Sequence, residues 1–300
     1  MTENQPSAAR GSAPRRRWRN PRPYAVVRRV IQLAFFLLAP SLFSSAFAGA
    51  KQLFTAVGQG APLPWNGFVK VLGALCGFTM LFGRWFCGYA CAFGALGDLV
   101  YAASAWLRRK AHKRPLRLPE KLSRILSYLP YGVLTAVLLL CALGLWPRVS
   151  AWSPWDAFSR LSALQLPMFL PGAVLLALIA AGMACEPRFF CRFLCPLGAL
   201  FRLLPILPWA VLRRDRSACV RGCAACTRAC PMGHTLGGGE EGAHCNAGDC
   251  IRCGLCAADC PKSNITTGIP ALRGHEHWLT GIRALGLLAL AGLLGLVRFL

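Results

Sequence analysis

Two cysteine runs between residues 219 and 261 decide how this chain folds. The first is CVRGCAACTRACP (219–231) and the second is CIRCGLCAADCP (250–261). The second run has the spacing C-x2-C-x2-C-x3-C-P, whereas the first has three residues, rather than two, between Cys219 and Cys223. Each run ends in Cys-Pro, and a glycine-rich insert separates the two. This spacing predicts a compact segment whose fold depends on what its cysteines hold.

The second run has the pattern of bacterial ferredoxins, in which three close cysteines bind one [4Fe–4S] cluster and the fourth binds the neighbouring cluster. Applied to both runs, this rule predicts two [4Fe–4S] clusters with crossed ligands. The ligands of one cluster would be Cys230, Cys250, Cys253 and Cys256, and those of the other would be Cys219, Cys223, Cys226 and Cys260.

The extra residue after Cys219 predicts a bulged loop or an exchanged ligand, and Cys245 is a spare thiol that could substitute. Zinc is the competing interpretation of a cysteine-rich segment. Zinc sites, however, pair two short cysteine hooks across a long spacer, and triplets closed by Cys-Pro fit that arrangement poorly. Iron–sulfur clusters are therefore the preferred prediction.

The composition predicts a membrane protein. Of the 300 residues, 55% are hydrophobic and 15% are charged, and the mean hydropathy is +0.46, whereas charged residues make up about a quarter of soluble domains. The net charge of +23 could suggest nucleic-acid binding. The Lys and Arg residues, however, concentrate beside apolar runs, as topology determinants do. The 16 cysteines lie in cluster spacing or in apolar segments, which argues against a secreted disulfide scaffold.

Five apolar segments are predicted to cross the bilayer as helices, because lipid tolerates no unpaired backbone. They are residues 30–48, 68–86, 125–146, 168–185 and 282–297. The first segment could alternatively be a cleaved signal peptide. Lys and Arg crowd the N-terminal tail and residues 106–124, while residues 49–65 carry only Lys51. The positive-inside rule then predicts a cytoplasmic N-terminus, a cytoplasmic ferredoxin segment and an outer C-terminus in the inner membrane.

An internal repeat carries a second group of cysteines. GRWFCGYACAFGALGDL (83–99) aligns with PRFFCRFLCPLGALFRL (187–203), which predicts two parallel helical hairpins. On a helix, residues four apart share a face, so each C-x3-C pair should point one way, and we expect both pairs to form one site. Thiols that only pack between helices are the alternative. The residues concerned are Cys87 and Cys91 in the first copy and Cys191 and Cys195 in the second.

Arg84 and Arg188 occupy matching positions in the two copies and would favour thiolate at these cysteines. The predicted chemistry is either a soft-metal site or thiol–disulfide cycling. No histidine lies inside an apolar segment, so a haem held by paired histidines is not expected. The histidines, His234 among them, fall in loops and are expected to be solvated. No catalytic triad or nucleotide-binding motif is visible.

The paired C-x3-C motifs followed by the cysteine runs resemble the membrane polyferredoxins of the NapH type, over about residues 28–265. These are quinol-dehydrogenase membrane components of periplasmic nitrate reductase systems. They are related to accessory proteins of nitrous-oxide reductase, methylamine utilisation and cytochrome oxidase assembly. In that family, four membrane helices carry two C-x3-C-P motifs at the cytoplasmic side, followed by two [4Fe–4S] clusters. This chain departs by Ala92 in place of the first proline, by the stretched Cys219 run and by a fifth helix.

The resemblance implies an electron carrier or quinol-dehydrogenase component rather than a stand-alone enzyme, with no catalytic residue of its own. Electrons would pass between the quinone pool or a cytoplasmic donor and a membrane or periplasmic redox partner, and quinone would be a further ligand. Two alternatives stay open at this point. One is a copper-handling assembly factor for a periplasmic metalloenzyme, and the other is a redox-sensing regulator.

The predicted fold is a membrane all-α helical bundle of about five transmembrane helices in two parallel hairpin repeats, with an inserted α+β two-cluster bacterial-type ferredoxin domain. The predicted divisions are a basic disordered cytoplasmic tail (1–29), a four-helix membrane domain (30–205), a cytoplasmic ferredoxin domain (206–270) and a C-terminal transmembrane helix (278–300).

Overall fold

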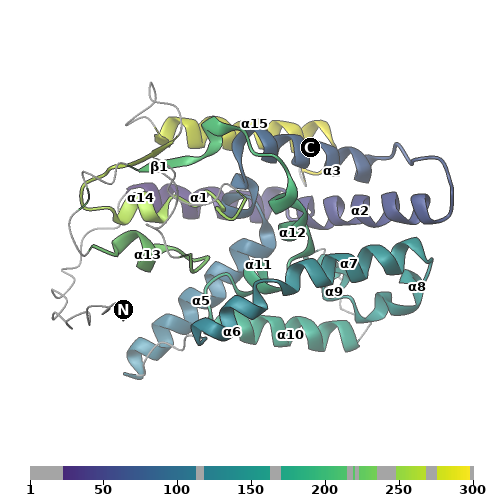
Figure 1. Cartoon of the computed structure of the whole chain (residues 1–300), viewed down its shortest axis with the longest axis horizontal. Coiled ribbons are helices and arrows are strands. Elements are labelled where there is room, and N and C mark those ends of the chain that lie inside the picture. The colour runs from purple at the N-terminus through teal and green to yellow at the C-terminus, as the bar shows by residue number, and fades with distance from the viewer. Residues whose placement is uncertain are drawn as a thin grey trace, which may run out of the picture.

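The computed structural model describes residues 23–112, 118–162, 170–214, 219, 223–234, 248–267 and 276–297. These residues are mostly helical, with one small two-stranded sheet (Figure 1). The longer helices are α1 (Pro23–Leu38), α2 (Leu42–Gly58), α3 (Gly67–Phe82), α5 (Ala92–Lys110), α7 (Leu129–Ala142), α10 (Leu170–Cys185) and α15 (Glu276–Leu293). The shorter ones are α4 (Trp85–Tyr89), α6 (Glu120–Leu126), α8 (Trp146–Val149), η1 (Ser150–Trp152), α9 (Pro154–Ser162), α11 (Phe189–Phe193), α12 (Pro196–Leu203), η2 (Pro208–Ala210), α13 (Ala225–Ala229) and α14 (Leu255–Asp259).

The first apolar segment is a bent pair of helices rather than the single straight helix predicted for residues 30–48. The axes of α1 and α2 differ by 61°. Pro40 lies at the break, where it lacks a backbone N–H and restricts the residue before it, so the helix cannot continue. The predicted tail also differs, since α1 begins at Pro23 and Arg28 is buried. Residues 1–22 of that tail lie outside the described part of the chain.

The helices α2, α3, α7, α10 and α15 run roughly along the long axis of Figure 1. Within the described residues, one helix, Lys121–Ala142, is long and apolar enough to cross a membrane, and the bent pair raises the number to two if it forms one span. The apolar helices at Gly67–Phe82, Pro171–Cys185 and Trp278–Leu293 are shorter. A helix rises about 1.5 Å per residue, so such helices alone fall short of a core about 30 Å thick. Five spans therefore remain a prediction.

Two glycines allow α2 to pack closely on its neighbours. A Cβ on Gly58 would overlap the backbone of Ala142 at the end of α7, and a Cβ on Gly49 would overlap the carbonyl of Phe68 in α3. Small residues at such crossings let helix backbones approach each other directly. The packing of α2 against α3 and α7 therefore depends on these two positions.

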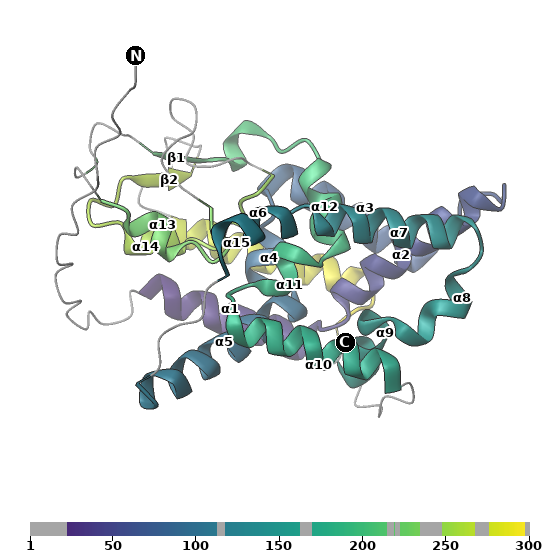
Figure 2. The ribbon, with the colours of Figure 1, turned by 60° about the horizontal axis from the view of Figure 1, so that its bottom comes forward.

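The cysteine-rich segment folds around the sheet at one end of the molecule (Figure 2). Strand β1 (Leu212–Arg214) pairs antiparallel with β2 (Ile265–Thr267), and Leu212 lies opposite Thr267. The short helices α13 and α14 pack against each other beside the sheet. Leu212, Ile265 and the buried cysteines of this segment form a small core of their own. This helix and strand content is what the prediction of an α+β ferredoxin domain requires.

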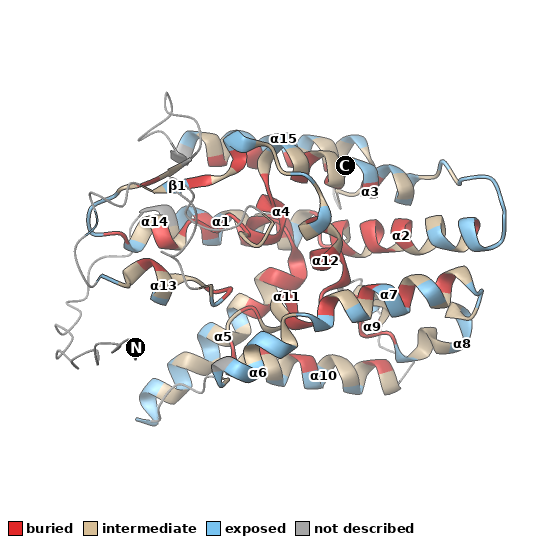
Figure 3. Cartoon of the chain, viewed as in Figure 1, coloured by how far each residue is buried: buried red, intermediate tan, exposed pale blue. Residues whose placement is uncertain are grey.

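The most deeply buried part of the chain lies where α4, α11 and α12 meet (Figure 3). Trp85, Tyr89 and Phe190 are among its fully buried side chains, and so are two arginines, Arg84 and Arg188. Charged side chains are almost never fully buried unless they are paired. The buried centre of the fold must therefore contain groups that pair with these two arginines.

Candidate functional site

The structure brings the first predicted set of cysteines to one small cavity in the ferredoxin segment. Cys250 and Cys253 approach it from the loop before α14, Cys256 from α14 itself, and Cys230 from the residue after α13. The backbone N–H of Arg252 donates to the Sγ of Cys250 at 3.4 Å. Four sulfurs with backbone N–H donors around a cavity form a donor set that suits an iron–sulfur cluster.

The second predicted set lines a separate cavity. Cys219, Cys223, Cys226 and Cys260 lie on its wall. The Nη1 of Arg214 lies 3.8 Å from the Sγ of Cys226, and the Nδ2 of Asn264 lies 3.5 Å from the Sγ of Cys219. Residues 220–222, which carry the extra length of this run, and Cys245 lie outside the described residues.

The crossing of the two runs has a local cause. Cys230 and Cys260 each follow a short helix and precede a proline. The residue before proline is held in an extended conformation, and the ψ angles of Cys230 and Cys260 are 114° and 119°. Each cysteine is thereby turned away from its own run toward the cavity of the other.

Burial affects the titration of residues that line the first cavity. It raises the pKa of the Cys253 thiol to about 11, while the charge of Arg28 acts in the opposite direction. A metal centre that binds there must therefore displace a proton. Burial also lowers the pKa of His234, which lines the same cavity. His234, which was expected to be solvated, is half-buried beside this cavity.

Each C-x3-C pair spans a break between two helices. Cys87 lies in α4 and Cys191 in α11, whereas Cys91 and Cys195 are the residues that precede α5 and α12. The ψ angles of Cys91 and Cys195 are 116° and 110°, so neither residue is helical. The expectation of one continuous helix face was therefore wrong. Pro196 explains the break in the second pair, and the first pair has the same geometry with Ala92.

The two C-x3-C pairs nevertheless come together. Cys87, Cys91, Cys191 and Cys195 are all buried. The thiol of Cys195 lies close enough to the other three for ionised sulfurs to repel one another. A sequence repeat does not by itself bring the two pairs together. Their proximity is a result of the tertiary fold.

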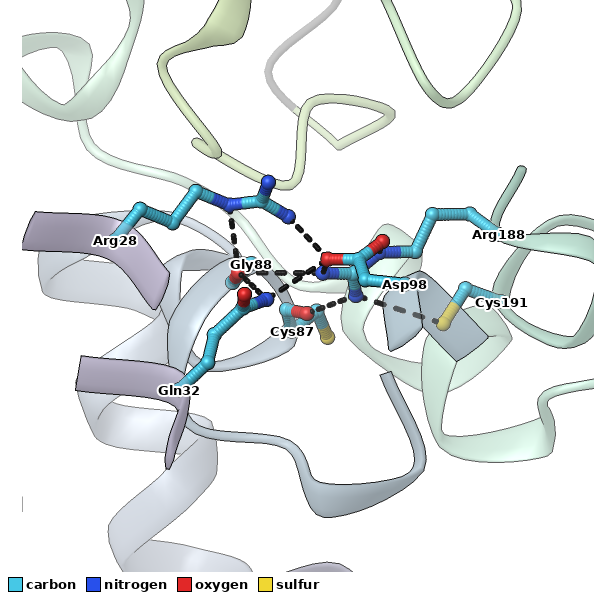
Figure 4. A network of polar contacts seen from close by, with 7 residues as sticks. All are labelled: Arg28, Gln32, Cys87, Gly88, Asp98, Arg188 and Cys191. Atoms are coloured by element: carbon cyan, nitrogen blue, oxygen red, sulfur yellow. Dashed lines mark hydrogen bonds and ion pairs between the residues drawn. The ribbon is translucent and has the colours of Figure 1, made fainter. Parts of the chain in front are cut away.

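A polar network joins the two copies of the repeat (Figure 4). The Nε and Nη2 of Arg188 donate to the two oxygens of Asp98, at 2.8 and 2.7 Å. The Nη1 of Arg188 donates to the carbonyl of Cys87 at 2.6 Å and lies 3.9 Å from the Sγ of Cys191. From α1, Arg28 pairs with Asp98, and Gln32 donates to Asp98 at 2.8 Å. Asp98 thus binds three side chains that come from two distant segments of the chain.

The titration of Asp98 follows from these neighbours. Burial raises its pKa, but the charges of Arg188 and Arg28 and the hydrogen bonds from Arg188 and Gln32 outweigh burial, so the pKa lies below its usual value. Arg188 adopts a left-handed backbone conformation, with φ of 56°. Such a conformation is uncommon outside glycine and persists where surrounding contacts hold the residue. The bidentate pair with Asp98 supplies those contacts.

The arginines of the two copies reach across to each other's glycines. A Cβ on Gly94 would overlap the Nη1 of Arg188, and a Cβ on Gly198 would lie 3.2 Å from the Nη2 of Arg84. Arg84 and Arg188 hold matching positions in the repeat, as do Gly94 and Gly198. The contact is therefore reciprocal, with the arginine of each copy lying over the glycine of the other.

The first C-x3-C pair also touches residues that line the first cluster cavity. Gly88, which lies between Cys87 and Cys91, packs against the backbone of Ile251 and Cys253. Asp98, Arg28, Gln32 and Gly88 were not identified from the sequence. The sequence carried a weak signal for Asp98, because it is a rare acid in a chain of 11 acidic and 34 basic residues.

Two family models match the chain. One, described as a 4Fe-4S binding domain, matches residues 64–114 and 168–211 and so covers both C-x3-C pairs. The other, described as a 4Fe-4S dicluster domain, matches residues 211–267 and covers both cysteine runs. The boundaries of the second match agree with the segment enclosed by β1 and β2.

Several proteins are similar to the chain over most of its length. The uncharacterized protein MJ0749 of Methanocaldococcus jannaschii is 29% identical over 80% of this chain and 81% of its own. The methylamine utilization ferredoxin-type protein MauN of Methylobacillus flagellatus is 29% identical, over 76% and 81%. The ferredoxin-type protein NapH of Escherichia coli K12 is 25% identical, over 89% and 96%. No solved structure matches the chain at a significant level.

Proposed function

Because this chain belongs to the NapH-type family of 4Fe–4S ferredoxin-type proteins, an iron–sulfur electron-transfer family, we propose that it is an integral-membrane electron carrier. It passes electrons between the quinone pool or a cytoplasmic donor and a membrane or periplasmic redox partner. The observation that carries the proposal is the pair of cavities in the ferredoxin segment, each lined by three cysteines of one run and the last cysteine of the other.

The proposed cofactors are two [4Fe–4S] clusters. One is held by Cys230, Cys250, Cys253 and Cys256, and the other by Cys219, Cys223, Cys226 and Cys260. A cluster supplies one-electron redox chemistry over a wide range of potentials. The residues of the chain hold the sulfurs in place, donate hydrogen bonds to them and exclude water from the first cavity, where Cys253 and Cys256 are buried. These second contacts tune the potential of such centres.

Membrane integration is supported by apolar side chains on the outer faces of the helices. Leu139 on α7, Leu178 on α10 and Leu285 on α15 are 56%, 62% and 69% exposed. Large exposed apolar side chains on several helices are consistent with contact to lipid. We propose that α2, α3, α7, α10 and α15 cross the inner membrane. The N-terminus and the ferredoxin domain (206–270) would face the cytoplasm, and the helix at 278–300 would end outside.

The four cysteines of the C-x3-C pairs are proposed to act as one site between the clusters and the membrane helices. Their mutual proximity and burial support this role. Four facing sulfurs either bind a soft metal centre or cycle between thiols and disulfide. Either chemistry relays electrons toward the membrane.

An apolar cavity of about 270 Å³ between α5, α9 and α10 supports a place for the quinone. Phe93, Leu96, Ala177 and Met183 are on its wall. The ring of Phe93 stacks on Phe190 with centroids 4.1 Å apart, and Phe190 precedes Cys191 in sequence. Ligand sites are typically concave and mostly apolar. A quinone ring there would lie beside the C-x3-C site.

Reduction of the clusters by quinol in proteoliposomes tests the proposal. The full-length protein is purified anaerobically, and cluster absorbance is followed after addition of a quinol and then of dithionite. Reduction by quinol supports the electron-carrier function. Reduction by dithionite alone, with each of several quinols inactive, would exclude the quinone pool as donor and leave the cytoplasmic donor.

Two variants on α10 make this test specific to the cavity. Ala177→Phe places a ring in the cavity and should slow reduction by quinol at least tenfold, while reduction by dithionite stays unchanged. Leu178→Phe is the matched control, because Leu178 is 62% exposed on the same helix and is not on the wall of the cavity. Equal rates for the two variants would remove the cavity from the quinone pathway.

A further inference from the structure

The C-x3-C site is surrounded by more positive than negative charge. Arg28, Arg84 and Arg188 are all buried around it. Arg28 and Arg188 share the carboxylate of Asp98. A buried charge is costly unless it is paired and hydrogen-bonded. The balance of charge among these described residues therefore calls for a negative group.

Arg84 shows most clearly that a negative group is missing among the described residues. Its side chain is fully buried, and its Nη1 donates to the carbonyl of Gly248 at 3.0 Å. Its Nε and Nη2 have no hydrogen-bond partner among the residues that the structure describes. The residue that matches Asp98 in the second copy of the repeat is Arg202. The sequence thus replaces the carboxylate that Arg188 has with another cation, and Arg84 is left without an acidic partner from that position.

The unpartnered end of Arg84 and the thiol of Cys195 have a common neighbour, Gly198. The Nη2 of Arg84 and the Sγ of Cys195 lie 3.2 and 3.4 Å from the point where a Cβ on Gly198 would be. Arg188 lies near the other cysteine of the same pair, with its Nη1 3.9 Å from the Sγ of Cys191. Two buried guanidinium groups, one from each copy of the repeat, therefore lie near the sulfurs of the second C-x3-C pair.

Backbone donors point at the sulfurs as well. The N–H of Gly198 donates to the Sγ of Cys195 at 3.2 Å, and the N–H of Gly94 donates to Cys91 in the same way. These N–H groups belong to the first turns of α12 and α5, where the helix dipole favours negative charge. Hydrogen bonds to a charged acceptor are stronger than those to a neutral one. The surroundings of the four sulfurs thus favour an anionic centre.

We infer that Cys87, Cys91, Cys191 and Cys195 hold a third iron–sulfur cluster, which deepens the proposed function and rests on the single site proposed there. A cluster with four thiolate ligands carries net negative charge and would compensate the positive charge of Arg84. A neutral disulfide would not. The N–H groups of Gly94 and Gly198 add hydrogen bonds that suit such an anionic centre. The 4Fe-4S binding domain match covers all four cysteines.

The position of this third cluster makes it a relay. Gly88 lies between two of its ligands and packs against Cys253, a ligand of the first ferredoxin cluster. In each transfer the ferredoxin cluster loses one electron and the third cluster gains it, with no bond made or broken. The third cluster then passes the electron to an acceptor bound among the membrane helices, or receives one from a donor there.

Iron and acid-labile sulfide in the full-length protein, purified anaerobically and reconstituted with ferrous iron and sulfide, test this inference. The two ferredoxin clusters account for about eight iron atoms per chain. We expect iron and sulfide above that value, and we expect the excess to be lost in Cys87→Ser/Cys191→Ser. The control is Cys76→Ser/Cys185→Ser, which removes two half-buried cysteines outside the site and should keep the excess.

The inference is overturned if wild type holds about eight irons and mass spectrometry finds the four cysteines as free thiols or disulfides, or if one copper ion replaces the excess. In those outcomes the ferredoxin clusters remain reducible, so the proposed function stands. Loss of all iron would instead overturn the proposed function.

A redox titration by electron paramagnetic resonance provides a second test that does not depend on the folding of the cysteine variant. Arg84→Gln should lower the potential of the third cluster, because a positive charge beside it is removed, and Arg84→Lys should restore it. An unchanged third potential in Arg84→Gln contradicts the inference.

Discussion

Gly88 lies directly against the carbonyl group of Ile251, although the two residues are far apart in sequence. A Cβ on Gly88 would overlap that carbonyl oxygen and would lie 3.3 Å from the backbone nitrogen of Cys253. The first C-x3-C pair and the loop that carries two cysteines of the first cavity are therefore in backbone contact. In the proposed relay, electron transfer between the two regions would depend on this close approach.

Gly88→Ala should push the Cys250–Cys256 loop away. Overpacking a buried contact costs about 1–3 kcal/mol, so we expect a lower unfolding temperature and slower transfer between the ferredoxin clusters and the C-x3-C site. Thermal unfolding and rapid-mixing absorbance measure the two effects. Gly73→Ala in α3 is the control, because a Cβ there meets nothing within 4 Å. Identical behaviour of the two variants would show that Gly88 is not a packing contact.

Asp98→Asn should destabilise the fold by about 3 kcal/mol, because it leaves Arg28 and Arg188 buried without their shared carboxylate. Chemical denaturation, followed by circular dichroism in detergent, measures the change. Asp156→Asn provides the comparison. Asp156 pairs with Lys51 but is 40% exposed, and exposed pairs contribute about 0–1 kcal/mol. Equal losses from the two substitutions would contradict the central role of Asp98.

The same carboxylate predicts a pH dependence. The pKa of folded Asp98 lies below its usual value, so its contribution to stability is present above the unfolded pKa of about 4. The contribution is lost as the pH falls through the folded pKa. We therefore expect the stability difference between wild type and Asp98→Asn to be constant from pH 7 to about pH 5 and to shrink below about pH 4. A difference that grew on acidification would mean that the pKa of Asp98 is raised.

Cys253→Ser should remove one ferredoxin cluster, with a loss of about four iron atoms per chain, while the other clusters remain visible by absorbance and magnetic resonance. Cys253 lines only the first of the two cluster cavities described here. Cys223→Ser should remove the other ferredoxin cluster in the same manner. Zinc in place of iron, with no visible absorption band, would contradict the cluster assignment for both cavities.

Reporter fusions test the orientation in the membrane. Fusions after His112 and after His275 should report the cytoplasm, and fusions near Gly60 or Ser159 should report the outer side. The reason is that Lys and Arg concentrate in the N-terminal tail and in residues 106–124, and loops rich in Lys and Arg stay in the cytoplasm. Residues 106–124 carry the strongest basic cluster after the tail, so replacing its Lys and Arg with Gln should weaken this pattern. An inverted result would place the ferredoxin domain outside.

The local chemistry of this protein was readable from the sequence. The spacing of Cys250, Cys253 and Cys256, and the Cys-Pro that ends each run, depend on short-range geometry, since a cluster loop is a few residues long and proline acts on its neighbour. The family, the ferredoxin segment and the repeat around Cys87 and Cys191 followed from such patterns. The apolar segments were located for the same reason, although the bend at Pro40 was missed.

The partners of the buried arginines were decided by the tertiary structure alone. Arg28 and Asp98 are 70 residues apart, and Arg188 and Asp98 are 90 apart, so no local pattern relates them. Arg84 and Arg188 look equivalent in the repeat. Among the described residues, Arg188 meets a carboxylate and Arg84 does not, because Asp98 and Arg202 differ at one matching position. Spacing along a chain reports which atoms can share a loop or a helix face. The cost of a buried charge is set by which distant groups folding brings beside it.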